Sequence, residues 1–128
     1  MAAVIDRQLG ELDARFGAVR SCALPSGNTL VTVEDVALPP GWSTTRTAVR
    51  FLIPVGYPFA ALDCFWADDN LRLSSGAVPQ NAGAGNVIPE TSEQGLWFSW
   101  HLEGAWDANR DTLSSWMNSI IDRLRRPQ

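Results

Sequence analysis

The stretch from residue 113 to residue 124 carries the clearest structural pattern in the sequence. Apolar residues recur there at i, i+3, i+4, i+7, i+8 and i+11, which places them on one face of a helix; they are Leu113, Trp116, Met117, Ile120, Ile121 and Leu124. Asn109 or Asp111 is the predicted N-cap, and Pro127 follows the end of the helix. Because such a helix has one broad apolar face, it must pack across another layer of the fold.

The preceding residues supply that layer and a second helix. Between residues 4 and 16, apolar residues again recur at helical spacing and predict an N-terminal helix. The period then changes to two, and turn residues separate four candidate strands at 19–24, 29–38, 45–54 and 62–66. We therefore predict an α+β fold in which an N-terminal helix precedes a four-stranded antiparallel meander and one C-terminal helix packs on the sheet.

The region from residue 68 to residue 94 has no such period. Its run SSGAVPQNAGAGN is small, polar and rich in glycine, which predicts a long surface loop. Loops of this length are uncommon in a compact domain unless they serve a function. The glycines do not form a phosphate-binding motif, because no strand-to-helix context and no GK[ST] element accompany them.

Length and charge restrict the classes of function. The 128 residues fit one domain, residues 1–128, with 45% apolar and 19% charged residues, as in ordered globular proteins. A net charge of −4 argues against nucleic acid as a partner. No apolar run reaches the roughly 18 residues of a membrane span, and the start does not read as a signal peptide. We expect a cytoplasmic protein without a nucleic-acid or membrane partner.

The two cysteines do not predict a metal centre. Cys22 and Cys64 lie in apolar segments without the spacing of a zinc site, so buried free thiols in a reducing compartment are expected. No other pattern of His, Cys, Asp and Glu indicates ligands. We therefore predict no metal and no cofactor.

The segment LWFSWHLEGAW, residues 96–106, holds three of the six tryptophans and the only histidine. In an extended backbone, Ser99 and His101 leave the same face with Trp97, whereas Phe98, Trp100 and Leu102 point toward a core. A hydroxyl nucleophile needs an adjacent base, and histidine titrates near neutral pH. The same alternation is also typical of a packed strand with a structural histidine, so both interpretations stay open.

The order of these segments resembles the ubiquitin-conjugating enzyme fold, and most closely its bacterial branch, prokaryotic family E. The similarity extends over about residues 5 to 125 and depends on the order of short motifs more than on any one of them. These motifs are Leu38-Pro39-Pro40-Gly41, Pro54, Gly56-Tyr57-Pro58-Phe59 before Phe65-Trp66, Trp100-His101, and Trp106-Asp107 leading into Asp111-Thr112-Leu113.

Two family features are missing. The usual enzymes carry a catalytic cysteine shortly before the tryptophan that matches Trp106, after a His-Pro-Asn motif whose asparagine supports the oxyanion. Here that neighbourhood has Ser99 and neither the cysteine nor the motif. Cys64 is expected inside the fourth strand, where burial would raise its pKa and keep it inert.

The resemblance leaves three hypotheses. In the first, Ser99 carries a ubiquitin-like protein as an oxyester, His101 is its base, and backbone N–H groups of the loop before Leu96 hold the oxyanion. In the second, the fold is a non-catalytic scaffold that binds a ubiquitin-like protein or an activating enzyme. In the third, it is a structural interaction module without a ubiquitin connection. For the first, the supporting residues are Trp97, Trp100, Trp106 and Asp107, and the imidazole is oriented by Asp107, Glu103 or Asp111.

Family resemblance also implies partners. They are a ubiquitin-like protein, an adenylating activating enzyme and often a JAB-type peptidase encoded in the same operon, in bacterial systems that resemble antiphage defence. The first helix usually docks the activating enzyme, and its exposed side is expected to present Arg7, Gln8, Glu11 and Arg15. A simple solvated helix face explains these residues equally well.

Overall fold

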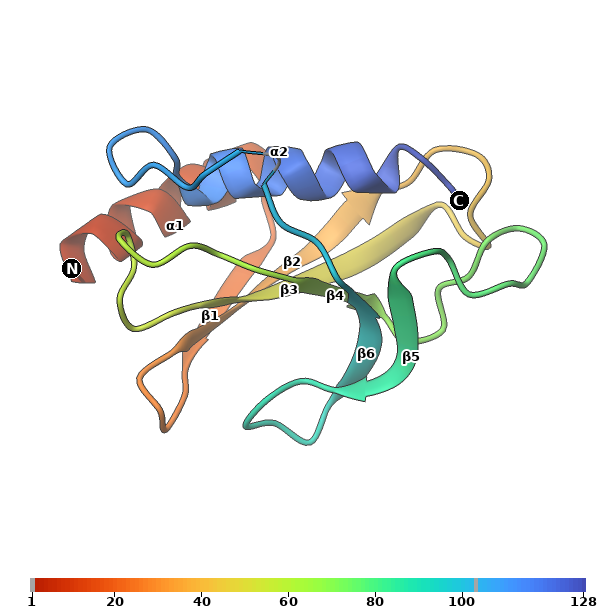
Figure 1. Cartoon of the computed structure of the whole chain (residues 1–128), viewed down its shortest axis with the longest axis horizontal. Helices are drawn as coiled ribbons and strands as arrows, with labels where there is room; N and C mark the ends of the chain where they lie inside the picture. Colours follow the sequence, from red (N-terminus) through yellow and green to blue (C-terminus); the bar gives the residue numbers. More distant parts are fainter. Residues whose placement is uncertain (1, 103) are drawn as a thin grey trace.

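The computed structural model describes residues 2–102 and 104–128. Within them, helices α1 (Ala2–Phe16) and α2 (Leu113–Leu124) lie on one face of an antiparallel sheet (Figure 1). The six strands are β1 (Val19–Ala23), β2 (Thr29–Ala37), β3 (Arg46–Ile53), β4 (Phe65–Asp68), β5 (Ala82–Val87) and β6 (Gln94–Phe98). The predicted α+β order of helix, sheet and helix is confirmed.

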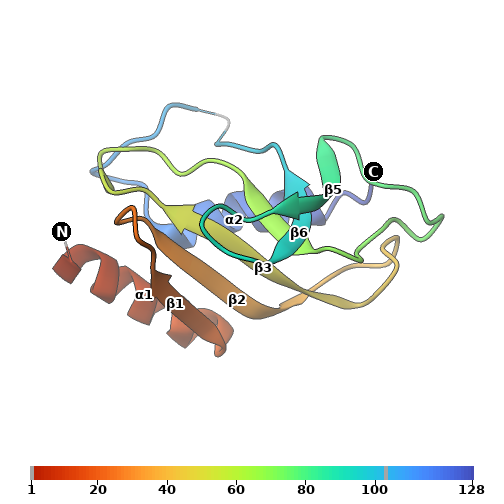
Figure 2. The same ribbon diagram turned by 90° about the horizontal axis from the view of Figure 1, so that it is seen from below.

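The sheet differs from the prediction in its number of strands. Its order is β1-β2-β3-β4-β6-β5, so the predicted meander is extended by two further strands (Figure 2). A long loop is expected over residues 68–94. This prediction is wrong for residues 82–87, because they form β5, which pairs with β6 through Ala82 and Phe98. Glycine, alanine and asparagine are poor strand formers, so β5 depends on this pairing and not on its own propensity.

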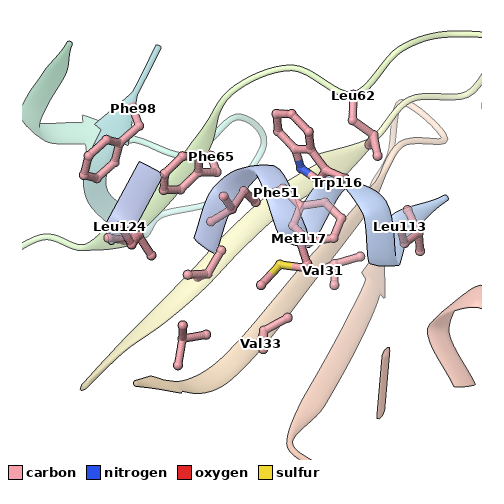
Figure 3. Packing of buried hydrophobic residues seen from close by; sticks show 14 of the residues in the cluster. Val31, Val33, Phe51, Leu62, Phe65, Phe98, Leu113, Trp116, Met117 and Leu124 are labelled. Carbon is pink, nitrogen blue, oxygen red and sulfur yellow. The ribbon is translucent and has the colours of Figure 1, made fainter. Parts of the chain in front are cut away.

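Helix α2 carries the core, as its pattern predicts. Trp116 and Met117 are fully buried between the helix and the sheet, where Val31, Phe51 and Phe65 face them from β2, β3 and β4 (Figure 3). A stacked pair of rings, Phe65 and Phe98 with centroids 4.6 Å apart, joins β4 to β6 under the same helix. The core therefore extends to the last residue of β6, next to Ser99.

The predicted N-cap of α2 is wrong. Thr112 is the cap: its side chain accepts from the Ser115 backbone N–H at 3.1 Å, and the Ser115 hydroxyl accepts from the Thr112 N–H at 2.8 Å. Asp111 instead accepts from the Asp107 N–H, in the turn before the helix. A serine at the third helical position replaces the usual Glu or Gln of a capping box, so the sequence lacks the usual signature of this motif.

Neither helix is long and apolar enough to cross a bilayer, among the residues that the structure describes.

Candidate functional site

The residues that follow β6 have the alternation expected from the sequence. Phe98 is buried, and Trp100 and Leu102 pack against the main core. Trp97 packs on the opposite face of the sheet, against a small cluster around Trp66 and Ile88. Ser99 and His101 are left exposed on the surface. They share the lining of one hollow of about 340 Å³.

Sheet pairing adds Asn81 to this hollow. The last pair of β6 and β5 is Phe98 with Ala82, and one residue further the Ser99 N–H donates to the Asn81 carbonyl at 2.8 Å. Asn81 has a φ of 58°, a left-handed conformation that asparagine tolerates better than most residues. No local sequence pattern predicts Asn81 as a neighbour of Ser99, because the two are brought together by pairing across the sheet and not by closeness in the chain.

His101 has a defined orientation. Its Nδ1 lies 3.0 Å from the carbonyl oxygen of the neighbouring Leu102. A carbonyl can only accept, so in the neutral ring Nδ1 bears the proton and Nε2 is left as the base. The ring also borders a second hollow of about 270 Å³, lined by Ala61, Leu62, Leu102, Gly104 and Trp106. His101 therefore stands between two surface depressions with an acceptor nitrogen on its ring.

The acidic residues expected to orient this ring have other partners. Asp107 accepts from the Asn109 N–H at 2.9 Å, and Asp111 accepts from the Asp107 N–H at 2.8 Å. Both carboxylates therefore hold the turn before α2. Glu103, the third candidate, lies outside the described residues. The orientation of His101 that the structure gives comes from the Leu102 carbonyl.

Tryptophan side chains connect the segment to the rest of the fold. The Trp106 Nε1 donates to the Pro58 carbonyl at 2.7 Å, and its ring centroid lies 5.8 Å from that of Tyr57. The Trp100 Nε1 donates to the Ser119 carbonyl on α2 at 3.2 Å. These bonds hold both ends of the stretch that contains His101.

A buried arginine fixes the other side of the hollow. Arg123 is 2% exposed and donates to the carbonyls of Gln80 at 2.9 Å, Arg126 at 2.8 Å and Gln128 at 3.0 Å. Its guanidinium lies 5.1 Å from the Phe98 ring centroid. Burial, and secondly Arg126, lower the pKa of Arg123. Arg123 thus holds the residue before Asn81 against α2.

Arg126 brings a positive charge to the hollow itself. It lines the hollow with Ser99 and His101, and its guanidinium lies 5.4 Å from the Trp100 ring centroid. Arg123 and Arg126 lie in and just after the last turn of α2, where cations are common because they meet the negative end of the helix dipole. Arg123 and Arg126 belong to the site because residues 80–81 and the end of β6 lie beside the C-terminal end of α2 in the folded chain.

The structure corrects both cysteine predictions in part. Cys22 is exposed on β1, where a buried thiol was expected. Cys64 stands directly before β4, half-buried, and its N–H donates to the Trp100 carbonyl at 2.8 Å. Burial raises the pKa of its thiol, as predicted, which keeps it protonated at neutral pH. Within the described ranges, no group of three or more His, Cys, Asp and Glu side chains is arranged to bind a metal.

One of the four residues predicted to form the partner-binding face of α1 is buried. Gln8 is 4% exposed, and its Oε1 accepts from the Tyr57 hydroxyl and from the Leu113 N–H at 3.0 Å. It therefore joins α1 to the start of α2, and its assignment to the exposed face is wrong. Arg7 and Glu11 are exposed and lie 3.8 Å apart as an ion pair. Arg15 is exposed and bonds to α2.

A comparison with protein families gives a match over residues 6–127 to the model described as prokaryotic E2 family E. The chain belongs to prokaryotic E2 family E. Comparisons with curated proteins and with solved structures gave no match. Family membership indicates an E2-like fold and a role related to ubiquitin conjugation. It also implies, in general terms, interaction with a ubiquitin-like protein and an activating enzyme.

Proposed function

We propose that this E2-family protein carries a ubiquitin-like protein as an oxyester on Ser99. The observation behind the proposal is the single hollow that Ser99, His101, Asn81 and Arg126 line together. It combines a hydroxyl, a base and two hydrogen-bond donors, which are the groups that acyl transfer to a weak nucleophile requires.

The chemistry follows from these positions. The Ser99 Oγ attacks the activated C-terminal carbonyl of the ubiquitin-like protein while the His101 Nε2 takes the hydroxyl proton. The Asn81 amide and the Arg126 guanidinium donate to the oxyanion that develops. When the intermediate collapses, the leaving group of the activated ester departs with the proton from His101, and the Ser99 ester remains.

These donors replace those expected from the sequence. The loop before Leu96 lies at the start of β6, whereas Ser99 follows its end. The five residues of β6 lie between the end of that loop and Ser99, a distance of about 20 Å at the rise of an extended chain. Backbone groups of that loop are therefore too far from Ser99 to hold its oxyanion.

The test is adduct formation with an activating enzyme, ATP and the ubiquitin-like protein encoded beside it. The expected adduct resists thiol reductant and is cleaved by hydroxylamine or base. Ser99→Ala and His101→Ala abolish it, and Ser99→Cys converts it into a reductant-sensitive thioester. Cys64→Ser is the matched control and leaves it intact. An adduct that persists in Ser99→Ala, or that Cys64→Ser removes, contradicts the proposal.

A scaffold that binds the same partners without chemistry is the second candidate. The hydrogen bonds of the described acidic residues favour it, because neither Asp107 nor Asp111 supports the imidazole. A scaffold predicts that the three proteins co-purify and that no adduct forms. It also predicts that Ser99→Ala leaves the affinity for the ubiquitin-like protein unchanged.

The exposed pair of Arg7 and Glu11 on α1 is the proposed dock for the activating enzyme. Arg7→Glu should weaken that binding without lowering the melting temperature, because the pair is exposed and contributes little to stability. Arg110→Glu, the same charge change at another exposed position, is the control. If both variants bind the activating enzyme with equal affinity, the docking site lies elsewhere. The proposed system also includes a JAB-type peptidase, whose gene is expected in the same operon.

A further inference from the structure

A second surface feature lies on the other flank of α2. It is a groove of about 600 Å³ between the last residues of α1, the end of β2 and the second half of α2. Its apolar lining consists mainly of Phe16, Val36, Leu38, Pro39, Ile121 and Leu124. A further hollow beside His101 meets α2 at Ser119 and Asp122 instead. The groove is thus separate from the Ser99 site.

The groove is open because the helical layer is incomplete at this point. α1 ends at Phe16, and its last turn meets α2 near the beginning of that helix, where Arg15 bonds to Ser114 and Asn118. Figures 1 and 2 show α2 continuing past the end of α1. The second half of α2 and the end of β2 therefore lack a helical neighbour on this side.

The rim of the groove is positively charged. Three arginines, Arg15, Arg46 and Arg125, line it together with one acidic residue, Asp35. The whole chain, in contrast, has a net charge of −4. Arg46 is paired with Asp35, and Arg125 lies 3.4 Å from Asp122 on α2 as an exposed ion pair, so Arg15 carries the uncompensated charge of the rim. Arg15 bonds to neutral acceptors, Ser114 Oγ at 2.8 Å and Asn118 Oδ1 at 2.6 Å, which leave its charge uncompensated.

We propose that this groove binds an acidic segment of a partner protein, which inserts apolar side chains between α2 and the end of β2. The volume lies within the roughly 300–1,000 Å³ of typical ligand sites, enough for one or two large side chains of a peptide. Carboxylates on either side of those anchors face Arg15 and Arg125. The apolar floor supplies affinity, and the arginine rim selects acidic flanks.

The experiment measures fluorescence anisotropy of a labelled peptide with the full chain. In the peptide, leucine and phenylalanine stand between two aspartates and two glutamates. Saturable binding that weakens as salt is raised is expected, because exposed charges are screened. A control peptide with lysines in place of the acidic residues should bind at least about fivefold more weakly, since like charges meet at the rim. No saturable binding, or equal binding of the two peptides, overturns the proposal.

Variants locate the binding. Arg125→Glu should weaken the acidic peptide at least about fivefold, whereas Arg110→Glu, an equal charge change at an exposed residue outside the groove, should not. Both variants should keep the wild-type melting temperature. Equal effects of the two substitutions would overturn the proposal. A dimer that forms without peptide and is lost in Arg125→Glu would assign the groove to a second copy and also overturn it.

This inference does not depend on the ester chemistry. Peptide binding is measured without an activating enzyme, and Ser99→Ala should leave it unchanged. Failure of the oxyester proposal would therefore leave the groove intact, and failure of peptide binding would say nothing against Ser99.

Discussion

The backbone N–H of Ser99 donates to the carbonyl of Asn81 at 2.8 Å, although Asn81 precedes β5 and Ser99 follows β6 in the chain. This bond continues the pairing of β6 with β5 by one residue beyond the last strand pair. It brings an asparagine from the glycine-rich run beside the candidate nucleophile. Asn81, which we propose as the oxyanion donor, thus reaches Ser99 from across the sheet and not from the residues just before it.

Replacement of Asn81 should slow ester formation more than it affects the fold. Asn81→Gly keeps the left-handed backbone, which glycine adopts without strain, and removes only the amide. Loss of one oxyanion donor is expected to lower the rate of adduct formation about 10²-fold. A single-turnover assay with the activated ubiquitin-like protein measures it. Asn70→Gly, at an exposed position, is the control, and equal rates in both variants would exclude Asn81 from the chemistry.

Ser99 and Trp116 should differ sharply in their contribution to stability. Trp116 is fully buried, so Trp116→Ala should lower the free energy of unfolding by about 3–5 kcal/mol. Phe51→Ala, at another fully buried position, should have a similar effect. Ser99 bonds to Asn81 through its backbone, which alanine retains, so Ser99→Ala should change stability little. Urea denaturation measures all three. A loss in Ser99→Ala as large as that in Trp116→Ala would make the hydroxyl a structural group.

The sequence predicted the parts of the fold in which side-chain period and burial agree. Trp116 and Met117 repeat at helical spacing because one face of α2 covers the sheet. Residues of β3 alternate because one face of that strand is buried and the other is only partly covered. β5 has no such signal. Its small residues are mostly exposed, and only the backbone pairing with β6 makes it a strand.

The candidate site was predictable only where it is local in sequence. Ser99 and His101 share a face because they follow one strand with a period of two. Asn81 lines the same hollow because β5 pairs with β6, and Arg126 lines it because the end of α2 packs nearby. No local sequence pattern encodes either placement. The sequence places Gln8 on the exposed face of α1, because a polar residue on an amphipathic helix is usually solvated. Its partners, Tyr57 and the first residue of α2, come from elsewhere in the fold.

Tyr57 should make stability depend on pH in the alkaline range. It is the only tyrosine, and burial raises its pKa from 10.0 to about 12. Between these values the unfolded chain has lost the phenolic proton and the folded chain retains it. The contribution of Tyr57 is therefore complete below pH 10 and is lost as the pH rises through about 12, with a slope of at most about 1.4 kcal/mol per pH unit.

Two measurements test this linkage. Ultraviolet absorbance of tyrosinate follows the ionisation of Tyr57 directly, and denaturation at several alkaline pH values gives the slope. Tyr57→Phe should remove the slope. It should also lower stability at neutral pH by about 1 kcal/mol, because Gln8 loses its donor. Ionisation of the folded protein near the ordinary value for tyrosine would contradict the buried contact with Gln8.

Arg123 connects the stability of the fold to the candidate site. Its guanidinium donates to the carbonyls of Gln80, Arg126 and Gln128, so it fixes the residue before Asn81. Arg123→Met keeps an unbranched apolar stem over Phe98 and removes the donors. Removing the hydrogen bonds of a charged group destabilises the fold, and removing the cost of burying that charge stabilises it. We expect the first effect to be larger, so the free energy of unfolding should fall by about 1–3 kcal/mol.

The same substitution should slow adduct formation at temperatures where the variant is fully folded. Without its bond to Arg123, the Gln80 carbonyl is released, and the backbone of Asn81, whose carbonyl accepts from the Ser99 N–H, is held less firmly. Arg110→Met, at an exposed position, controls for the loss of charge. Faster amide hydrogen exchange at residues 80–82 in Arg123→Met, with an unchanged rate at α1, would identify positioning as the cause. Slower adduct formation with unaltered exchange at 80–82 would assign the effect to charge alone.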